Sequence, residues 1–118
     1  MNIVLVEPEI PQNTGNISRT CAVTGVSLHL VGKLGFSTDD KYLKRSGLDY
    51  WHMLDLHYYS SLAELYGRYP QGRFFYATTK GGRLYTQPEY NKDDFLVFGK
   101  ETKGLPEELL MDNLDCCI

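Results

Sequence analysis

Hydrophobic residues occur along this chain in short runs that alternate with polar or amphipathic segments. Continuous apolar runs are typical of strands that a parallel sheet buries on both faces. The runs with this pattern are NIVLV, SLHLVG, LDLHYY, RFFYATT and FLVFG, and DCCI resembles the start of a sixth strand. Because the segments between them have helical signals, the pattern predicts an α/β fold with a mostly parallel, doubly wound sheet.

The first helical segment follows NIVLV and a stretch rich in proline. Two prolines and a glycine predict a loop over residues 7–16, and a helix is expected through residues 15–24. Asn13 or Thr14 is the expected cap of this helix, and Gly25 is its expected end. The side chains expected to face inward are Ile17, Cys21 and Val23 or Thr24.

Three further segments have helical signals. Residues 37–47 carry acids in the first turn and bases in the last, which is the order that a helix dipole favours. Ser61 and Glu64 have the spacing of a capping box at the start of residues 60–69. Pro106 opens the last segment, LPEELLMDN.

In a doubly wound α/β fold, ligands bind at the carboxyl ends of the strands. This rule selects three loops as candidate sites: residues 7–16, 77–83 and 99–106.

Length and composition fit one domain over residues 1–118, with 42% apolar and 23% charged residues. No apolar run approaches the roughly 20 residues of a membrane span, and the N-terminal segment lacks the features of a signal peptide, so we expect a cytoplasmic protein. The 3 cysteines have no metal-ligand spacing. Reduced thiols and no metal site are therefore expected.

The net charge of −3 means that an anionic partner would have to bind a local basic patch. Basic residues gather in two parts of the chain: Lys33, Lys41, Lys44 and Arg45, then Lys80, Arg83, Lys92, Lys100 and Lys103. Acidic residues are interspersed in both parts. On charge alone, a solvated surface therefore stays open as an alternative to a binding patch.

Several common site motifs are absent. The stretch GKETKG has the glycine spacing of a phosphate loop, but Leu105 and Pro106 follow it where a Walker motif needs lysine and serine or threonine. No strand leads into the glycine fingerprint of a dinucleotide-binding fold. His29 lies inside an apolar run and His57 has no nucleophile motif nearby, so both are expected to be structural or surface residues.

The stretch PQNTGNISR is a stronger candidate for a site. On a helix, Asn16 and Arg19 share a face, and Asn13 lies at the amino-terminal end where backbone N–H groups also point outward. Two amides, a guanidinium and a helix terminus would meet in one small volume. The alternative from these residues alone is an asparagine cap beside a surface arginine.

The two loops together resemble motifs of the SPOUT class of RNA methyltransferases. Members of its ribose-methylating branch carry N-x-G-x-x-x-R after the first strand and F-G-x-E-x-x-G-[LI]-P later in the chain. The matching residues here are Asn13, Gly15 and Arg19, then Phe98, Gly99, Glu101, Gly104, Leu105 and Pro106. The stretches IVLVEPEIPQNTGNISR, GFSTDDKYLKRSGLDYW and ATTKG are similar to the small tRNA wobble-nucleotide 2′-O-methyltransferases of that class.

This resemblance implies a trefoil-knot fold, a homodimer, a tRNA anticodon stem-loop as partner, and S-adenosylmethionine as cofactor. It also implies site residues, which fall into three groups. They are Arg19, Asn13 and Asn16 for catalysis; Ala77, Thr78, Thr79, Gly99, Glu101, Gly104 and Leu105 for the cofactor; and Lys41, Lys44, Arg45, Lys80 and Lys103 for RNA. In this scheme the glycines of FGKETKGLP let the backbone approach the cofactor.

Members of the family continue past the position of CCI into a segment that completes the knot and the cofactor pocket. We therefore expect the 118 residues to form a C-terminally incomplete SPOUT-like domain. Two alternatives to a wobble-nucleotide methyltransferase stay open. One is a catalytically inactive RNA-binding α/β module that has lost its cofactor site, and the other is a flavodoxin-like or other α/β enzyme.

Overall fold

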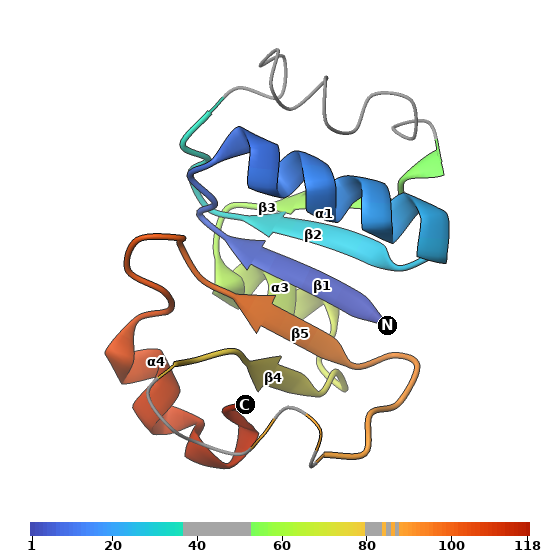
Figure 1. The fold of residues 1–118 in the computed structure, drawn as a ribbon. Helices are drawn as coiled ribbons and strands as arrows, with labels where there is room; N and C mark the ends of the chain where they lie inside the picture. The colour runs from blue at the N-terminus through green and yellow to red at the C-terminus, as the bar shows by residue number, and fades with distance from the viewer. Residues whose placement is uncertain (37–52, 80–83, 85, 87) are drawn as a thin grey trace.

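The computed structural model describes residues 1–36, 53–79, 84, 86 and 88–118 (Figure 1). Within this part of the chain, a five-stranded sheet has the order β3-β2-β1-β5-β4. Its strands are β1 Asn2–Val6, β2 Ser27–Val31, β3 Leu56–Tyr59, β4 Phe74–Tyr76 and β5 Phe95–Phe98. Every pair of neighbouring strands is parallel, which confirms the predicted α/β fold. The helix expected over residues 37–47 lies outside the described residues.

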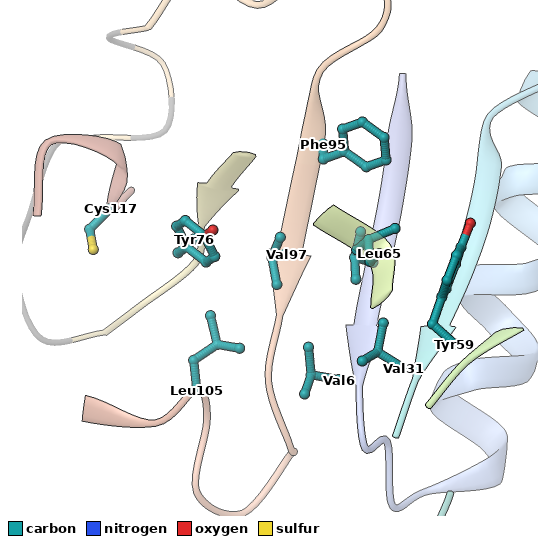
Figure 2. Packing of buried hydrophobic residues seen from close by; sticks show 10 residues of the cluster. Val6, Val31, Tyr59, Leu65, Tyr76, Phe95, Val97, Leu105 and Cys117 are labelled. Atoms are coloured by element: carbon teal, nitrogen blue, oxygen red, sulfur yellow. The ribbon is translucent and has the colours of Figure 1, made fainter. Parts of the chain in front are cut away.

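Helices cover both faces of the sheet (Figure 1). Helix α1, Pro11–Thr24, packs on the face formed by Leu5, Leu28 and Leu30. Helices α3, Leu62–Arg68, and α4, Glu107–Asp112, pack on the opposite face. Alternate residues of each strand point to opposite faces, so the continuous apolar runs supply two separate cores. Figure 2 shows part of the second core: Val6, Val31, Tyr59, Leu65, Tyr76, Phe95, Val97, Leu105 and Cys117.

Helix α1 begins earlier than predicted. Its first residue is Pro11 and its cap is Ile10, so the expectation that Asn13 or Thr14 caps the helix is wrong. Proline is well suited to the first helical position, because its fixed φ is helical and its missing N–H would have no partner there. Gly25 ends the helix in the left-handed conformation at φ 75°, as predicted.

The inward face of α1 consists of small side chains: Thr14, Gly15, Ser18, Cys21 and Ala22. The prediction was right for Cys21, which is buried, and for Ile17, which is partly buried and packs against the same core. It was wrong for Val23 and Thr24, because Val23 is 61% exposed and Thr24 also faces solvent. The Ser18 hydroxyl donates to the Thr14 carbonyl at 2.7 Å, which satisfies it inside the helix. Small residues bring the axis of α1 close to the sheet.

The predicted capping box of α3 is present in a modified form. Ser61 is the cap and its hydroxyl accepts from the Glu64 N–H at 3.2 Å. The Glu64 carboxylate, however, accepts from the backbone N–H and the hydroxyl of Ser60, both at 2.7 Å. The reciprocal contact therefore reaches one residue further back than the motif predicts.

The last residues only begin the sixth strand that was predicted. Leu114–Cys116 form a short 3-10 helix, and Cys117 then makes a parallel bridge with Tyr76. The Ile118 N–H donates to the Tyr76 carbonyl, and the Thr78 N–H donates to the Ile118 carbonyl, both at 3.0 Å. The end of the chain is thus paired along the free edge of β4.

Candidate functional site

The connections of the sheet reverse direction between β1 and β5. The chain passes from β1 outward to β2 and β3, and the two later strands lie on the other side of β1. In open parallel sheets, ligands bind at the carboxyl ends of the strands beside such a switch point. Two segments meet there: residues 7–10, called the first loop below, and residues 99–106, called the glycine loop.

The glycine loop is a tight turn whose two glycines are needed for its own folding. The Gly104 N–H donates to the Lys100 carbonyl at 2.8 Å, and Gly104 is left-handed at φ 66°. A Cβ on Gly99 would lie 2.1 Å from the carbonyl carbon of Gly104 and 2.3 Å from the nitrogen of Leu105. No side chain fits at Gly99, because the returning backbone occupies its place.

The far end of the glycine loop is anchored in the core. Leu105 is 5% exposed and packs with Val6 and Val97 among the buried residues (Figure 2). Its side chain thus fixes the turn against β1 and β5. Because the side chain is buried, the backbone atoms of Leu105 would have to make the contact with a cofactor that the resemblance implies.

Glu101 joins the glycine loop to the first loop. Its carboxylate accepts from the backbone N–H of Glu9 at 2.8 Å and from that of Ile10 at 3.2 Å. Ile10 caps α1 and has no side-chain hydrogen bond to the helix, so Glu101 supplies a carboxylate at this helix start from another part of the chain. A negative charge is favourable at the amino-terminal end of a helix.

Glu9 makes the reciprocal connection. Its carboxylate accepts from the Thr102 hydroxyl at 2.7 Å and from the Thr102 N–H at 3.2 Å. These bonds lower the pKa of Glu9 from its usual value, with the Thr102 hydroxyl as the largest cause. Beside this pair, Lys100 lies 3.5 Å from the Glu7 carboxylate. The two loops are therefore joined by reciprocal carboxylate hydrogen bonds and an ion pair.

Glu7 itself has an unusual backbone conformation. Its φ of 48° is in the left-handed region, which costs energy for a residue other than glycine. Gly32 leaves room for the Glu7 side chain, because a Cβ there would lie 2.8 Å from the Glu7 Cγ. Strain of this kind often lies at functional sites, and here it lies where the central strand enters the first loop.

The predicted catalytic residues lie on the helix that follows the first loop. Asn13, Asn16 and Arg19 are all exposed, on the solvent side of α1. They lie on one helix, and Glu101 binds backbone N–H groups just before its first turn. Each is three residues from the next, which is a spacing at which helical side chains are neighbours. Asn13 is therefore not the cap of α1, and it lies in the first turn with an exposed side chain.

The segment after β4, residues 77–79, begins next to β5, the strand that leads into the glycine loop. The Ala77 N–H donates to the Val97 carbonyl at 2.9 Å, and Thr79 is exposed. Lys103 is exposed on the glycine loop. The other residues predicted to bind RNA, which are Lys41, Lys44, Arg45 and Lys80, lie outside the described residues.

The buried histidine has a structural environment, as predicted. His29 is fully buried and its two ring nitrogens lie 3.0 Å from the Tyr59 hydroxyl and 3.0 Å from the Asn2 side-chain oxygen. It also stacks on His57 at 5.0 Å between ring centroids. Burial, followed by the neighbouring His57, lowers the pKa of His29 to about 4, so the ring is neutral at neutral pH.

The described residues offer neither a metal site nor a membrane-spanning helix. No group of three or more His, Cys, Asp or Glu side chains in that part of the chain could hold a metal ion. None of its helices has the length and apolar character needed to cross a membrane.

Comparison with known proteins agrees with this geometry. The model of the SpoU rRNA Methylase family matches residues 1–118. A protein of Photorhabdus asymbiotica named tRNA (cytidine(34)-2′-O)-methyltransferase is 49% identical over 119 residues, which are 97% of this chain and 73% of the relative. The parallel α/β sheet of this chain is thus that of an RNA methylase. The chain belongs to the SpoU methylase family.

Solved structures give the same result. One, described as giving insights into the 2-OH methylation of C/U34 on tRNA, has a TM-score of 0.89 and 41% identity over 93% of this chain and 73% of its own. The SpoU methyltransferase AviRb from Streptomyces viridochromogenes, solved with AdoMet, has a TM-score of 0.82 over 99% of this chain and 49% of its own. At 18% identity, AviRb supports the fold alone.

The roles of Glu9, Thr102 and Glu7 were not predicted from the sequence. The available signal was weak: two glutamates beside prolines in a loop at the carboxyl end of the first strand. Their partners are about ninety residues away along the chain, and no local pattern links them. Only the fold brings these residues together.

Proposed function

We propose that this protein transfers a methyl group from S-adenosylmethionine to the ribose 2′-hydroxyl of the wobble nucleotide, cytidine or uridine 34, in the tRNA anticodon loop. The observation that carries the proposal is the joining of the glycine loop to the start of α1 at the switch point. That arrangement occurs in a chain 49% identical to a methyltransferase named for this reaction. It would hold a cofactor and a substrate side by side.

The cofactor would lie at the carboxyl ends of β4 and β5. A Cβ built on Gly104 meets no atom within 4 Å, so the backbone of the glycine loop is open to a ligand on that side. Residues 77–79 and the backbone of Gly99–Leu105 would then hold it, with Glu101 fixing the loop. When bound, S-adenosylmethionine supplies a methyl group on a positively charged sulfur.

The residues of α1 would orient the ribose. Transfer needs the 2′-oxygen in line with the methyl carbon and sulfur, so positioning accounts for much of the rate. Arg19 would hold the phosphate beside the target ribose and stabilise the oxygen as its proton leaves. A guanidinium stays protonated in proteins and is therefore a poor general base, so we assign Arg19 this electrostatic role. Asn13 and Asn16 would hold the nucleotide by their side-chain amides.

Replacement of Arg19 by lysine tests this role. Lysine keeps the charge but not the planar fork of donors, so Arg19→Lys should retain partial methyl transfer, and more of it at raised pH, while Arg19→Ala should lose at least tenfold more. The measurement is the single-turnover rate on a tRNA anticodon stem-loop between pH 7 and 9. Activity of Arg19→Lys equal to that of the wild type would contradict the assignment.

Basic side chains would bind the stem-loop phosphates. Lys103 lies on the glycine loop, and Lys41, Lys44, Arg45 and Lys80 are proposed from the sequence alone. A homodimer would bring a second copy of the site to the same RNA. Both features belong to the proposal for the whole enzyme.

Binding of the cofactor is the first test of the proposed function. Titration calorimetry with S-adenosylmethionine measures this binding. Methyl transfer should then be measured with an anticodon stem-loop and with a matched stem-loop that carries a 2′-deoxynucleotide at position 34. Transfer to the first RNA alone supports the proposal. RNA binding without cofactor binding would instead indicate an inactive RNA-binding module.

A further inference from the structure

Four hydrogen bonds join the first loop to the glycine loop. Two run from backbone N–H groups of the first loop to Glu101, and two run from Thr102 to the carboxylate of Glu9. The family motif of the glycine loop includes Glu101, whereas neither Glu9 nor Thr102 is a motif residue. Each loop therefore has a carboxylate that accepts two hydrogen bonds from the other loop.

The first loop is also held from its other side. The Gly35 N–H donates to the Pro8 carbonyl at 2.9 Å, and a Cβ on Gly35 would lie 3.0 Å from the Cα of Glu9. The backbone at Glu9 is thus packed between residue 35 and the glycine loop. Its side chain reaches Thr102 of the glycine loop.

We propose that Glu9 is a positioning residue for methyl transfer. By binding Thr102 it would fix the glycine loop relative to the start of α1, and hence relative to Arg19. The inference rests on the proposed function, in which the glycine loop holds the cofactor and α1 orients the ribose. A displacement of about 1 Å between two reacting groups can lower a rate about a hundredfold, so a contact that sets their separation affects the chemical step.

Stability alone is a poor explanation for this contact. Thr102 is exposed, and hydrogen bonds in contact with water contribute little net stability because water replaces them on unfolding. Leu105 already anchors the glycine loop in the core, and Pro11 already starts α1. What the Glu9 carboxylate adds is the relative placement of the two segments.

The test is a comparison of kcat and KM between the wild-type protein and its variants. We expect Glu9→Ala to lower kcat ten- to a hundredfold, with KM for S-adenosylmethionine and for the stem-loop changed less than threefold. Glu9→Gln should recover much of kcat, because its amide oxygen still accepts from Thr102. Thr102→Val should lose activity and Thr102→Ser should keep it. The double variant Glu9→Ala/Thr102→Val should be no worse than the poorer single variant.

Glu64 provides a matched control. Its carboxylate also accepts from one backbone N–H and one hydroxyl, but on α3, away from the switch point. Glu64→Ala should leave kcat within twofold of the wild type. If Glu9→Ala and Glu64→Ala behave alike, or if Glu9→Ala changes only the unfolding midpoint, Glu9 is not a positioning residue. Failure of the proposed function would look different, because the wild type itself would transfer no methyl group.

Discussion

At the scale of single residues, Gly99 and Gly104 have different reasons to be glycine. Gly104 adopts a positive φ of 66°, whereas Gly99 lies against the peptide that joins Gly104 to Leu105. The resemblance to the family implied that both glycines make room for a cofactor. The structure shows that the turn itself needs both glycines, and that the space beside Gly104 is open.

Substitution of Gly99 should therefore destabilise the fold. In Gly99→Ala the new methyl group would overlap backbone atoms that cannot move without reshaping the turn, and we expect a loss of about 1–3 kcal/mol in the free energy of unfolding. Urea unfolding followed by circular dichroism measures it. Gly67→Ala is the matched control, because Gly67 lies in α3 with open space around it and should gain roughly 0.5–1 kcal/mol. Equal effects at the two positions would contradict the prediction.

The buried neutral His29 makes stability depend on pH. Its pKa is lowered from the ordinary 6.5 to about 4 in the folded protein, so only the unfolded chain binds a proton between these values. The contribution of His29 is fully present above pH 6.5 and is lost progressively as the pH falls toward 4. Between pH 7.5 and 5 the loss should be about 2 kcal/mol.

Urea unfolding at pH 7.5, 6.5, 5.5 and 5 tests this dependence. The variant His29→Gln has no proton to gain, so its unfolding free energy should vary less across the series by about the same 2 kcal/mol. Above pH 5 the carboxylates with lowered pKa, such as that of Asp55, stay ionised in both states and add little. Parallel curves for the wild type and the variant would rule out His29 as the source.

At the scale of elements, α1 and α3 show how a helix start depends on its surroundings. Ser61 caps α3 from its own segment, as the local pattern predicts. The cap residue of α1 is Ile10, which offers no side-chain oxygen, and Glu101 binds the nearby N–H groups from the other side of the switch point. One helix start is set by its own sequence, and the other is stabilised by a tertiary contact.

The local cap of α3 can be tested separately. Ser61→Ala removes the acceptor of the Glu64 N–H and should cost about 1 kcal/mol of stability. Ser60→Ala is the control, because the Ser60 backbone N–H continues to bind the Glu64 carboxylate. We expect its effect on the unfolding free energy to be less than half as large. A larger loss in Ser60→Ala would show that the contact one residue further back is the more important one.

At the scale of the whole molecule, the net charge of −3 is unfavourable for binding the proposed tRNA substrate, which is also negatively charged. An acidic protein must meet phosphates with a local group of cations, because its overall field repels the RNA. On the glycine loop, Lys100 is paired with Glu7, while Lys103 is exposed. Binding of the stem-loop should accordingly depend on a few phosphate contacts.

Salt should weaken RNA binding far more than cofactor binding. With about four phosphates neutralised, the affinity for the anticodon stem-loop should fall roughly a hundredfold between 50 and 200 mM salt. Fluorescence anisotropy with a labelled stem-loop measures this slope. The affinity for S-adenosylmethionine, titrated in the same buffers, serves as the control and should change less than threefold. A flat salt dependence for the RNA would argue against lysine-phosphate contacts.

The sequence by itself determined the strands, the parallel α/β class and the motif loops, because apolar runs, turn residues and motif spacing are local properties. It was less accurate at the boundaries of α1, since Pro11 can end a loop or begin a helix and only packing against the sheet decides between them. The pairing of Glu9 with Thr102, of Glu101 with the start of α1 and of Lys100 with Glu7 was decided by the tertiary structure. These partners are about ninety residues apart, and the strand order that places β1 beside β5 is what brings them into contact.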